Sequence, residues 1–194
     1  MIKIGISGNR YSGKTFVCDK FKKLSIPVFE ADIIMRYLIK YNKDVQEKYS
    51  EKLYNFNYDY RKLNNDKEYI DILIDSTEEE LFAAYDRFQI KNKNSTYTIF
   101  SSSILFEKNW HDLMDFSINV FAPKYTRTDR AFELYKIKRA DTSKFILDEM
   151  DPLLKNRMAS FVIHSYSGTE SVDNQINNIN NFVIEYNKNK IVAI

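Results

Sequence analysis

The sequence predicts an α/β fold in which helices flank a five-stranded parallel sheet. Two observations carry this prediction. Five short apolar segments alternate along the 194 residues with longer stretches of helical periodicity. A phosphate-binding motif, G-x-x-x-x-G-K-[ST], stands at Gly8–Thr15, directly after the first of these segments. Strand, loop and helix therefore follow one another in the order that this motif requires.

The first half of the chain supplies two strands and their helices. The apolar, β-branched Ile2–Ser7 is the first strand, and Thr15–Lys23 is a helix with its Phe and Val side chains inward and Cys18 in the core. The second strand, Ile26–Phe29, ends at Glu30-Ala31-Asp32. The next helix, from about Ile33 to Lys40, is expected to bury Ile33, Ile34, Tyr37 and Leu38.

An insertion over the nucleotide-binding core follows these elements. Residues of about 43–94 are polar and rich in Tyr and Lys, with a strong helix start at Ser76–Glu80. The remaining strands are expected at Thr96–Phe100, Asp115–Phe121 and Ala159–His164, and the remaining helices at about Tyr125–Ile137, Thr142–Asn156 and from Thr169 onward. The whole chain, 1–194, is expected to be a single domain.

Composition limits the classes of function. A net charge of +2 leaves no large nucleic-acid footprint, and no apolar run reaches membrane-spanning length. The single cysteine excludes a disulfide framework, so we expect a cytoplasmic protein. We further expect a monomer or weak homo-oligomer that acts on a small molecule. His111 and His164 lack a ligand spacing, which argues against a zinc site.

The phosphate-binding motif predicts a nucleotide site for ATP and Mg²⁺. Lys14 would reach the β- and γ-phosphates, and the Thr15 hydroxyl would join the Mg²⁺ shell. Backbone amides of the loop and the following helix N-terminus present partial positive charge to phosphate. The expected ATP-binding residues are Gly8, Asn9, Arg10, Tyr11, Ser12, Gly13, Lys14, Thr15 and Phe16.

Two charged residues after the second strand are candidates for the acceptor side. Asp32 would accept a hydroxyl proton or bind Mg²⁺ through water, and its alternative role is the N-cap of the next helix. Arg36 lies four residues further along the same helix face. It would either clamp a phosphate or pair with Asp32.

Basic residues of the second half have two interpretations each. Arg127 and Arg130 share one helix face, where one would point at the nucleotide phosphates from the side opposite Lys14, or both would be solvated. Lys136, Lys138 and Arg139 belong to a segment of about 136–146 that would form a mobile lid over ATP, or would be an ordinary basic helix end.

Several segments together resemble the dephospho-coenzyme A kinase family. The phosphate loop is shared by many kinases, but Ile26–Arg36 is similar to that family's more diagnostic second motif. Ile104–Glu107 resembles its L-L-F-E segment, and Ala122-Pro123 with Arg130 resembles its A-P…R segment. The stretch from Lys155 to Thr169 resembles the family's closing motif.

The resemblance implies a P-loop kinase core with a helical substrate domain and a lid. It implies ATP-dependent phosphorylation of the ribose 3′-hydroxyl of dephospho-CoA. Asp32 would be the base or would orient the hydroxyl. Lys14 and Arg130 would hold the transferring phosphoryl group, and Arg36, Ile104 and Glu107 would line the acceptor site.

The chain departs from the family pattern at several positions. Asn9 and Tyr11 stand where the family usually has glycine, Glu30 replaces an Asp, and Glu149 and Ser165 replace a Gln and an Asn. Two alternative functions therefore stay open. One is a nucleoside or deoxynucleoside monophosphate kinase, and the other is a nucleotide-binding protein without useful turnover.

Overall fold

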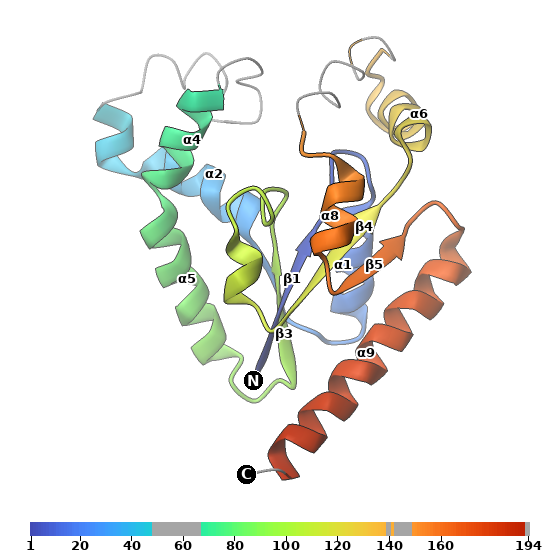
Figure 1. Cartoon of the computed structure of the whole chain (residues 1–194). Coiled ribbons are helices and arrows are strands. Elements are labelled where there is room, and N and C mark those ends of the chain that lie inside the picture. The colour runs from blue at the N-terminus through green and yellow to red at the C-terminus, as the bar shows by residue number, and fades with distance from the viewer. Residues whose placement is uncertain (48–66, 139–140, 142–148, 193–194) are drawn as a thin grey trace. The chain divides into compact units, whose positions relative to one another are not determined.

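The computed structural model describes residues 1–47, 67–138, 141 and 149–192 (Figure 1). The chain divides into two compact units. One consists of Met1–Phe29 and Asn92–Ile194, and the other of Glu30–Lys91. The first unit carries the phosphate loop.

A five-stranded parallel sheet confirms the predicted fold class. The carboxyl ends of the strands lie along one edge of the sheet, because Ile6 pairs with Ser101 and Phe121 with His164. The phosphate loop leaves the sheet at this edge, where ligands of parallel α/β folds bind. In the spatial order β2-β3-β1-β4-β5, the strands are β1 (Ile2–Ser7), β2 (Val28–Glu30), β3 (Tyr97–Ser101), β4 (Phe116–Phe121) and β5 (Phe161–His164).

Alternate residues of the strands face different layers. The isoleucines of β1 share a buried core with α1 (Lys14–Lys23) and α9 (Thr169–Val192), which pack against each other (Figure 1). Gly5, on the other side of β1, leaves room for Leu105, whose Cδ2 would lie 2.7 Å from a Cβ at this position. Val17, Cys18 and Phe21 of α1 are buried as predicted, whereas Phe16 is 41% exposed.

The helices after β4 differ in part from the expectation. The predicted helix α6 spans Lys124–Tyr135. The predicted helix over Thr142–Asn156 is wrong at its end, because α8 covers only Pro152–Met158, and residues 142–148 lie outside the described residues. Asp151 caps α8 by accepting a hydrogen bond from the Leu153 amide at 2.9 Å, and Pro152 occupies the first helical position. Glu149 therefore precedes α8 and is not part of that helix. A short 3₁₀ helix, η2, covers Trp110–Leu113.

The second unit contains the helices α2 (Ala31–Tyr41), α4 (Lys67–Asp75) and α5 (Glu78–Lys91). The start of α5 confirms the predicted helix start. The predicted buried face of α2 is wrong, because Ile33 is 48% and Tyr37 61% exposed, whereas Met35 and Ile39 are buried. Met35 packs toward α5 and its sulfur accepts a hydrogen bond from Thr77 Oγ1 at 2.7 Å. Both faces of α2 carry apolar residues, so periodicity alone did not select the buried one.

Candidate functional site

The phosphate loop folds as a tight turn with two residues in the left-handed region. The Ser12 amide donates to the Asn9 carbonyl at 3.0 Å, while Tyr11 has a φ of 62° and Gly13 a φ of 96°. Gly8 is required by close approach, since a Cβ there would lie 2.9 Å from the Val120 carbonyl oxygen. Of the two positions where the resemblance expects glycine, it is Tyr11 that must adopt the unfavourable backbone angle.

The loop ends at a helix N-terminus that no side chain caps. Gly13 is the N-cap of α1, no acidic residue lies in the first turn, and the helical ladder begins with the Val17 amide donating to the Gly13 carbonyl. The amides of Thr15 and Phe16 precede that ladder. This end of α1 therefore presents backbone donors and the positive end of the helix dipole to an anion.

Lys14 lies at the first position of α1 and reaches the end of β3. Its Nζ donates to Ser101 Oγ at 3.2 Å, and Cys18 Sγ donates to the same oxygen at 3.4 Å. The ammonium group is thus held by a neutral hydroxyl at the carboxyl edge of the sheet, where the motif requires a cation.

Arg130 brings a second cation to the loop from α6. Its guanidinium donates to the Ser12 carbonyl at 2.9 Å, the Tyr11 carbonyl at 3.3 Å, and Ser165 Oγ and carbonyl oxygen at 3.0 and 2.7 Å. These partners, the only ones among the described residues, are all neutral oxygens. Burial lowers the pKa of the Arg130 guanidinium, which nevertheless stays charged at neutral pH. The site therefore holds a partly desolvated positive charge that an anion would compensate.

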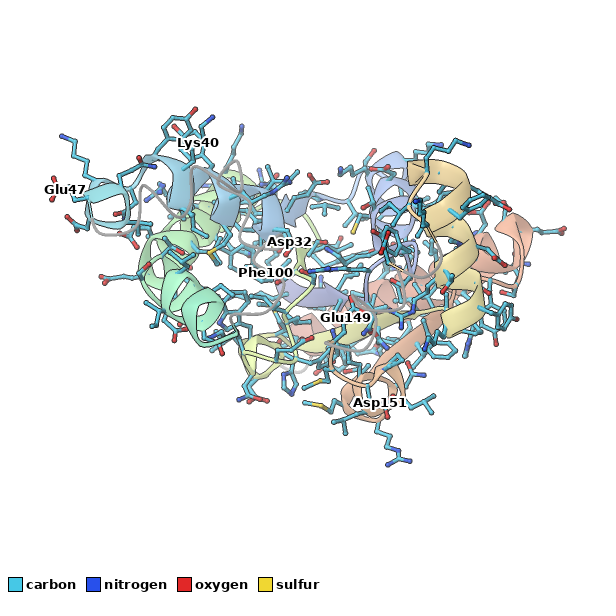
Figure 2. The ribbon with its side chains drawn as sticks, turned by 90° about the horizontal axis from the view of Figure 1, so that it is seen from above. Asp32, Lys40, Glu47, Phe100, Glu149 and Asp151 are labelled. Carbon is cyan, nitrogen blue, oxygen red and sulfur yellow. The ribbon has the colours of Figure 1, made fainter. Side chains whose placement is uncertain are left out.

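Arg127 corrects the interpretation of a solvated arginine pair. It is 1% exposed and forms an ion pair of 2.6 Å with Glu149. Glu149 (Figure 2) also accepts a hydrogen bond from the Arg10 amide at 2.7 Å. In the sequence Glu149 and Ser165 stand out only as departures from a motif, yet both contact the phosphate-loop region. A buried arginine requires a carboxylate, but nothing in the sequence says which arginine is buried.

Glu107 is tied to a buried lysine. Lys155 of α8, 1% exposed, places its Nζ 2.7 Å from Glu107 Oε1 and donates to the Ser103 carbonyl at 3.1 Å. Ser7 Oγ donates to the same carbonyl at 3.4 Å. Ile104 is half-buried, and its amide donates to Ser102 Oγ at 3.3 Å. The segment that would line the acceptor site, Ile104–Glu107 with the adjacent Ser103, thus contacts both β1 and α8.

Asp32 and Arg36 belong to the second unit. The N-cap of α2 is Glu30, so Asp32 is not the cap and instead lies at the second helical position. An acidic group in the first turn is favoured by the helix dipole. Arg36 Nε donates at 3.2 Å to the main-chain carbonyl of Asp32. Both side chains are half-buried.

The predicted lid lies largely outside the described residues. Lys136 ends α6 with a φ of 57°, and the Lys138 carbonyl accepts a hydrogen bond from the Asp141 amide at 3.0 Å. Arg139 and residues 142–148 are not described. The lid therefore stays a prediction.

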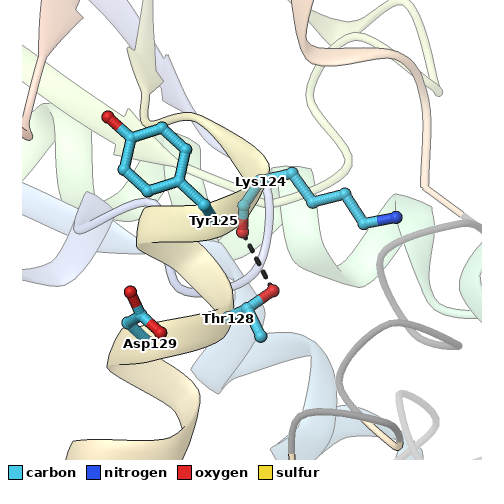
Figure 3. A pocket seen from close by; sticks show the side chains of 4 residues that line it. All are labelled: Lys124, Tyr125, Thr128 and Asp129. Carbon is cyan, nitrogen blue, oxygen red and sulfur yellow. Dashed lines mark hydrogen bonds between the residues drawn. The ribbon is translucent and has the colours of Figure 1, made fainter.

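A separate hollow lies on the surface of α6. Lys124, Tyr125, Thr128 and Asp129 line it, and Thr128 Oγ1 donates to the Lys124 carbonyl at 2.9 Å (Figure 3). All four residues come from the first two turns of one helix. No residue of the phosphate loop takes part, so this hollow is not the candidate site.

Two features are absent from the described part of the chain. No group of three or more His, Cys, Asp or Glu side chains there is arranged to hold a metal ion. None of its helices combines the length and the apolar character needed to cross a bilayer.

Known proteins of low sequence identity align with nearly the whole chain. No family model matches the chain. The dephospho-CoA kinase of Clostridium perfringens is 22% identical over 198 aligned positions, covering 96% of this chain and 100% of that protein. The dephospho-CoA kinase of a Wolbachia sp. subsp. Brugia malayi is 25% identical over 200 positions, covering 91% and 95%.

Solved structures share the fold at low identity. A Thermus thermophilus protein has a TM-score of 0.80 at 20% identity, covering 92% of this chain and 95% of its own. Dephospho-CoA kinase from Campylobacter jejuni has a TM-score of 0.55 at 17% identity, covering 93% and 96%. Shikimate kinase from Bacteroides thetaiotaomicron has a TM-score of 0.53 at 13% identity, covering 94% and 98%. The solved structures confirm the predicted fold. The two curated relatives confirm the resemblance to dephospho-CoA kinases and the prediction of a kinase.

Proposed function

We propose that this protein transfers the γ-phosphoryl group of ATP to the ribose 3′-hydroxyl of dephospho-CoA, giving CoA and ADP. Two observations support the nucleotide half of the proposal: the N-terminus of α1 has no side-chain cap, and Arg130 donates to the loop before it. The acceptor is supported by the two relatives of that name, which align with nearly the whole chain.

The loop residues suit a nucleotide triphosphate. Arg130 supplies a cation held by neutral oxygens, so those partners do not cancel its charge, and Lys14 supplies a second cation at the end of β3. Two buried loop atoms, Asn9 Oδ1 and Ser12 Oγ, have no hydrogen-bond partner among the described residues. A polyphosphate would receive amide hydrogen bonds from the loop and charge compensation from both cations.

The reaction is an in-line displacement at the γ-phosphorus. The 3′-oxygen of the acceptor forms a bond to phosphorus, the bond from phosphorus to the bridging β,γ-oxygen breaks, and ADP leaves. Asp32 would take the proton of the attacking hydroxyl, while Lys14 and Arg130 would stabilise the charge on the transferring group. Arg36, one turn from Asp32 on α2, would bind the acceptor.

Magnesium fits the same loop. When bound to ATP, Mg²⁺ neutralises charge on the β- and γ-phosphate oxygens. Thr15, the second residue of α1, carries an exposed side chain at the uncapped helix N-terminus and would give its hydroxyl to the ion.

A coupled ADP-release assay tests the acceptor. We expect kcat/KM for dephospho-CoA to exceed that for dAMP, dTMP or dGMP at least roughly tenfold, because the pantetheine tail adds binding that orients the hydroxyl. A preference for dTMP or dAMP would establish a nucleoside or deoxynucleoside monophosphate kinase instead. ATP binding without any transfer would support a protein that only binds nucleotides.

Asp32→Asn tests the proposed base. We expect turnover to fall roughly 10²- to 10⁴-fold with ATP affinity little changed, since the amide keeps the size but cannot accept the proton. Asp44→Asn, on an exposed position of the same unit, is the control. Unchanged turnover with a lower Tm would show that Asp32 only stabilises α2.

A further inference from the structure

We infer that Glu149 and Arg127 are positioning residues that hold the first half of the phosphate loop in its nucleotide-binding conformation. The inference rests on the proposed nucleotide binding and concerns neither the acceptor nor the proton transfer. It assigns a role to a carboxylate outside the phosphate-binding motif.

The Glu149 carboxylate grips two consecutive loop residues. Oε1 accepts from the Arg10 amide at 2.7 Å, and Oε2 accepts from Asn9 Nδ2 at 3.2 Å. The neighbouring Met150 carbonyl accepts from the same Asn9 amide nitrogen at 2.9 Å. The Glu149 side chain is 15% exposed, so water competes poorly for these bonds.

Arg127 needs Glu149 because it is buried. Its NH1 lies 2.6 Å from Glu149 Oε2 and 3.4 Å from the Arg10 carbonyl oxygen, while its Nε has no partner among the described residues. Without the carboxylate, a buried guanidinium would be uncompensated, which is strongly unfavourable. The ion pair therefore keeps a donor in place against the loop backbone.

The two arginines of α6 together orient the loop peptides. Arg127 donates to the carbonyl of Arg10, and Arg130, one turn later, donates to the carbonyls of Tyr11 and Ser12. In a trans peptide the carbonyl points opposite to the amide of the next residue. The amides of Tyr11 and Gly13 are consequently directed away from α6.

Tyr11 shows why the loop needs this support. A tyrosine at a φ of 62° is in a sparsely populated region, and such a residue persists only when its surroundings hold it there. Arg127 holds the peptide directly before Tyr11 and Arg130 the peptide directly after it, while Glu149 holds the amide of Arg10, one peptide earlier.

Nucleotide binding without acceptor tests this inference. We compare Glu149→Gln and Glu149→Asp with the wild type and with Glu170→Gln, a control at an exposed position of α9. By calorimetry with ADP, Kd should rise about tenfold in both Glu149 variants, because the charged contact to the Arg10 amide is weakened or cannot be reached. Glu149→Asp keeps the charge beside Arg127, so it tests the loop contact even where Glu149→Gln fails to fold.

Steady-state kinetics and amide exchange separate positioning from plain stabilisation. KM for ATP should rise about tenfold while kcat at saturating ATP stays within about threefold, and exchange of the Arg10 amide should accelerate. Wild-type ADP affinity in the folded Glu149 variants would overturn the inference and leave the proposed function intact. Absence of nucleotide binding by the wild type would overturn both.

Discussion

The ion pair between the buried Lys155 and the partly exposed Glu107 predicts an asymmetric response to mutation. Lys155 is 1% exposed, whereas the Glu107 side chain is 29% exposed, at an ion-pair distance of 2.7 Å. Lys155→Met removes the ammonium and keeps a similar length of aliphatic chain. Glu107→Leu removes the carboxylate and leaves the ammonium in the core with the Ser103 carbonyl as its remaining partner among the bonds described above.

The unequal exposure of the two side chains determines how much each substitution should lower the free energy of unfolding. Breaking a fully buried pair costs about 3–5 kcal/mol, because one charge is left uncompensated. Glu107→Leu leaves the buried ammonium and should cost that full amount. Lys155→Met leaves a carboxylate that water partly solvates, so we expect about 2–3 kcal/mol. The double variant carries no buried charge, and its stability should return to within about 1 kcal/mol of the wild type.

Urea unfolding followed by circular dichroism measures these differences, and thermal melting checks them. At about 2–4 °C per kcal/mol for a chain of this size, the Tm of Lys155→Met should fall by about 4–12 °C. Arg157→Met, at an exposed position of α8, is the matched control. Equal losses in both single variants, or additive losses in the double variant, would refute the argument from unequal burial.

Three further predictions concern the loop and the core. Lys14→Ala should abolish phosphoryl transfer and leave the Tm within about 2 °C, since the ammonium compensates phosphate charge and lies at the carboxyl edge of the sheet beside Ser101 Oγ; near wild-type turnover in a coupled assay would remove the phosphate-loop assignment. Tyr11→Gly should relieve a left-handed φ of 62° and raise the free energy of unfolding by up to about 1 kcal/mol, and a loss of more than that in urea titration would contradict the strain. Burial raises the pKa of Tyr97 well above its usual value, and its hydroxyl donates to Asn180 Oδ1 at 2.8 Å. The folded state thus keeps this proton after the unfolded chain loses it. The contribution of Tyr97 to the free energy of unfolding is therefore fully present below about pH 10 and falls by about 1.4 kcal/mol per pH unit above it. Tyr97→Phe should flatten the alkaline decline by that amount, and parallel pH profiles for the two proteins would disprove the assignment.

The sequence by itself determined the order of strands and helices and the place of the phosphate loop. Apolar segments such as Ile2–Ser7 can be predicted as strands, because a central parallel strand is buried on both faces and is therefore apolar along its length. The sequence also predicts the roles of Gly8, Gly13 and Lys14. Close backbone approach, positive φ and phosphate charge restrict those three positions to few residue types. Each of these requirements restricts the residue types at single positions or short segments, so short sequence patterns are enough to predict them.

The tertiary structure decided which polar and apolar groups are buried and what they contact. Arg127 and Arg130 are both arginines on α6, yet one is neutralised by Glu149 and the other holds loop carbonyls. The buried face of α2 likewise depended on its packing against α5 and not on its own period. Such outcomes depend on partners distant in sequence, because the free energy of a buried charge or an apolar face is set by the groups that the fold brings to it.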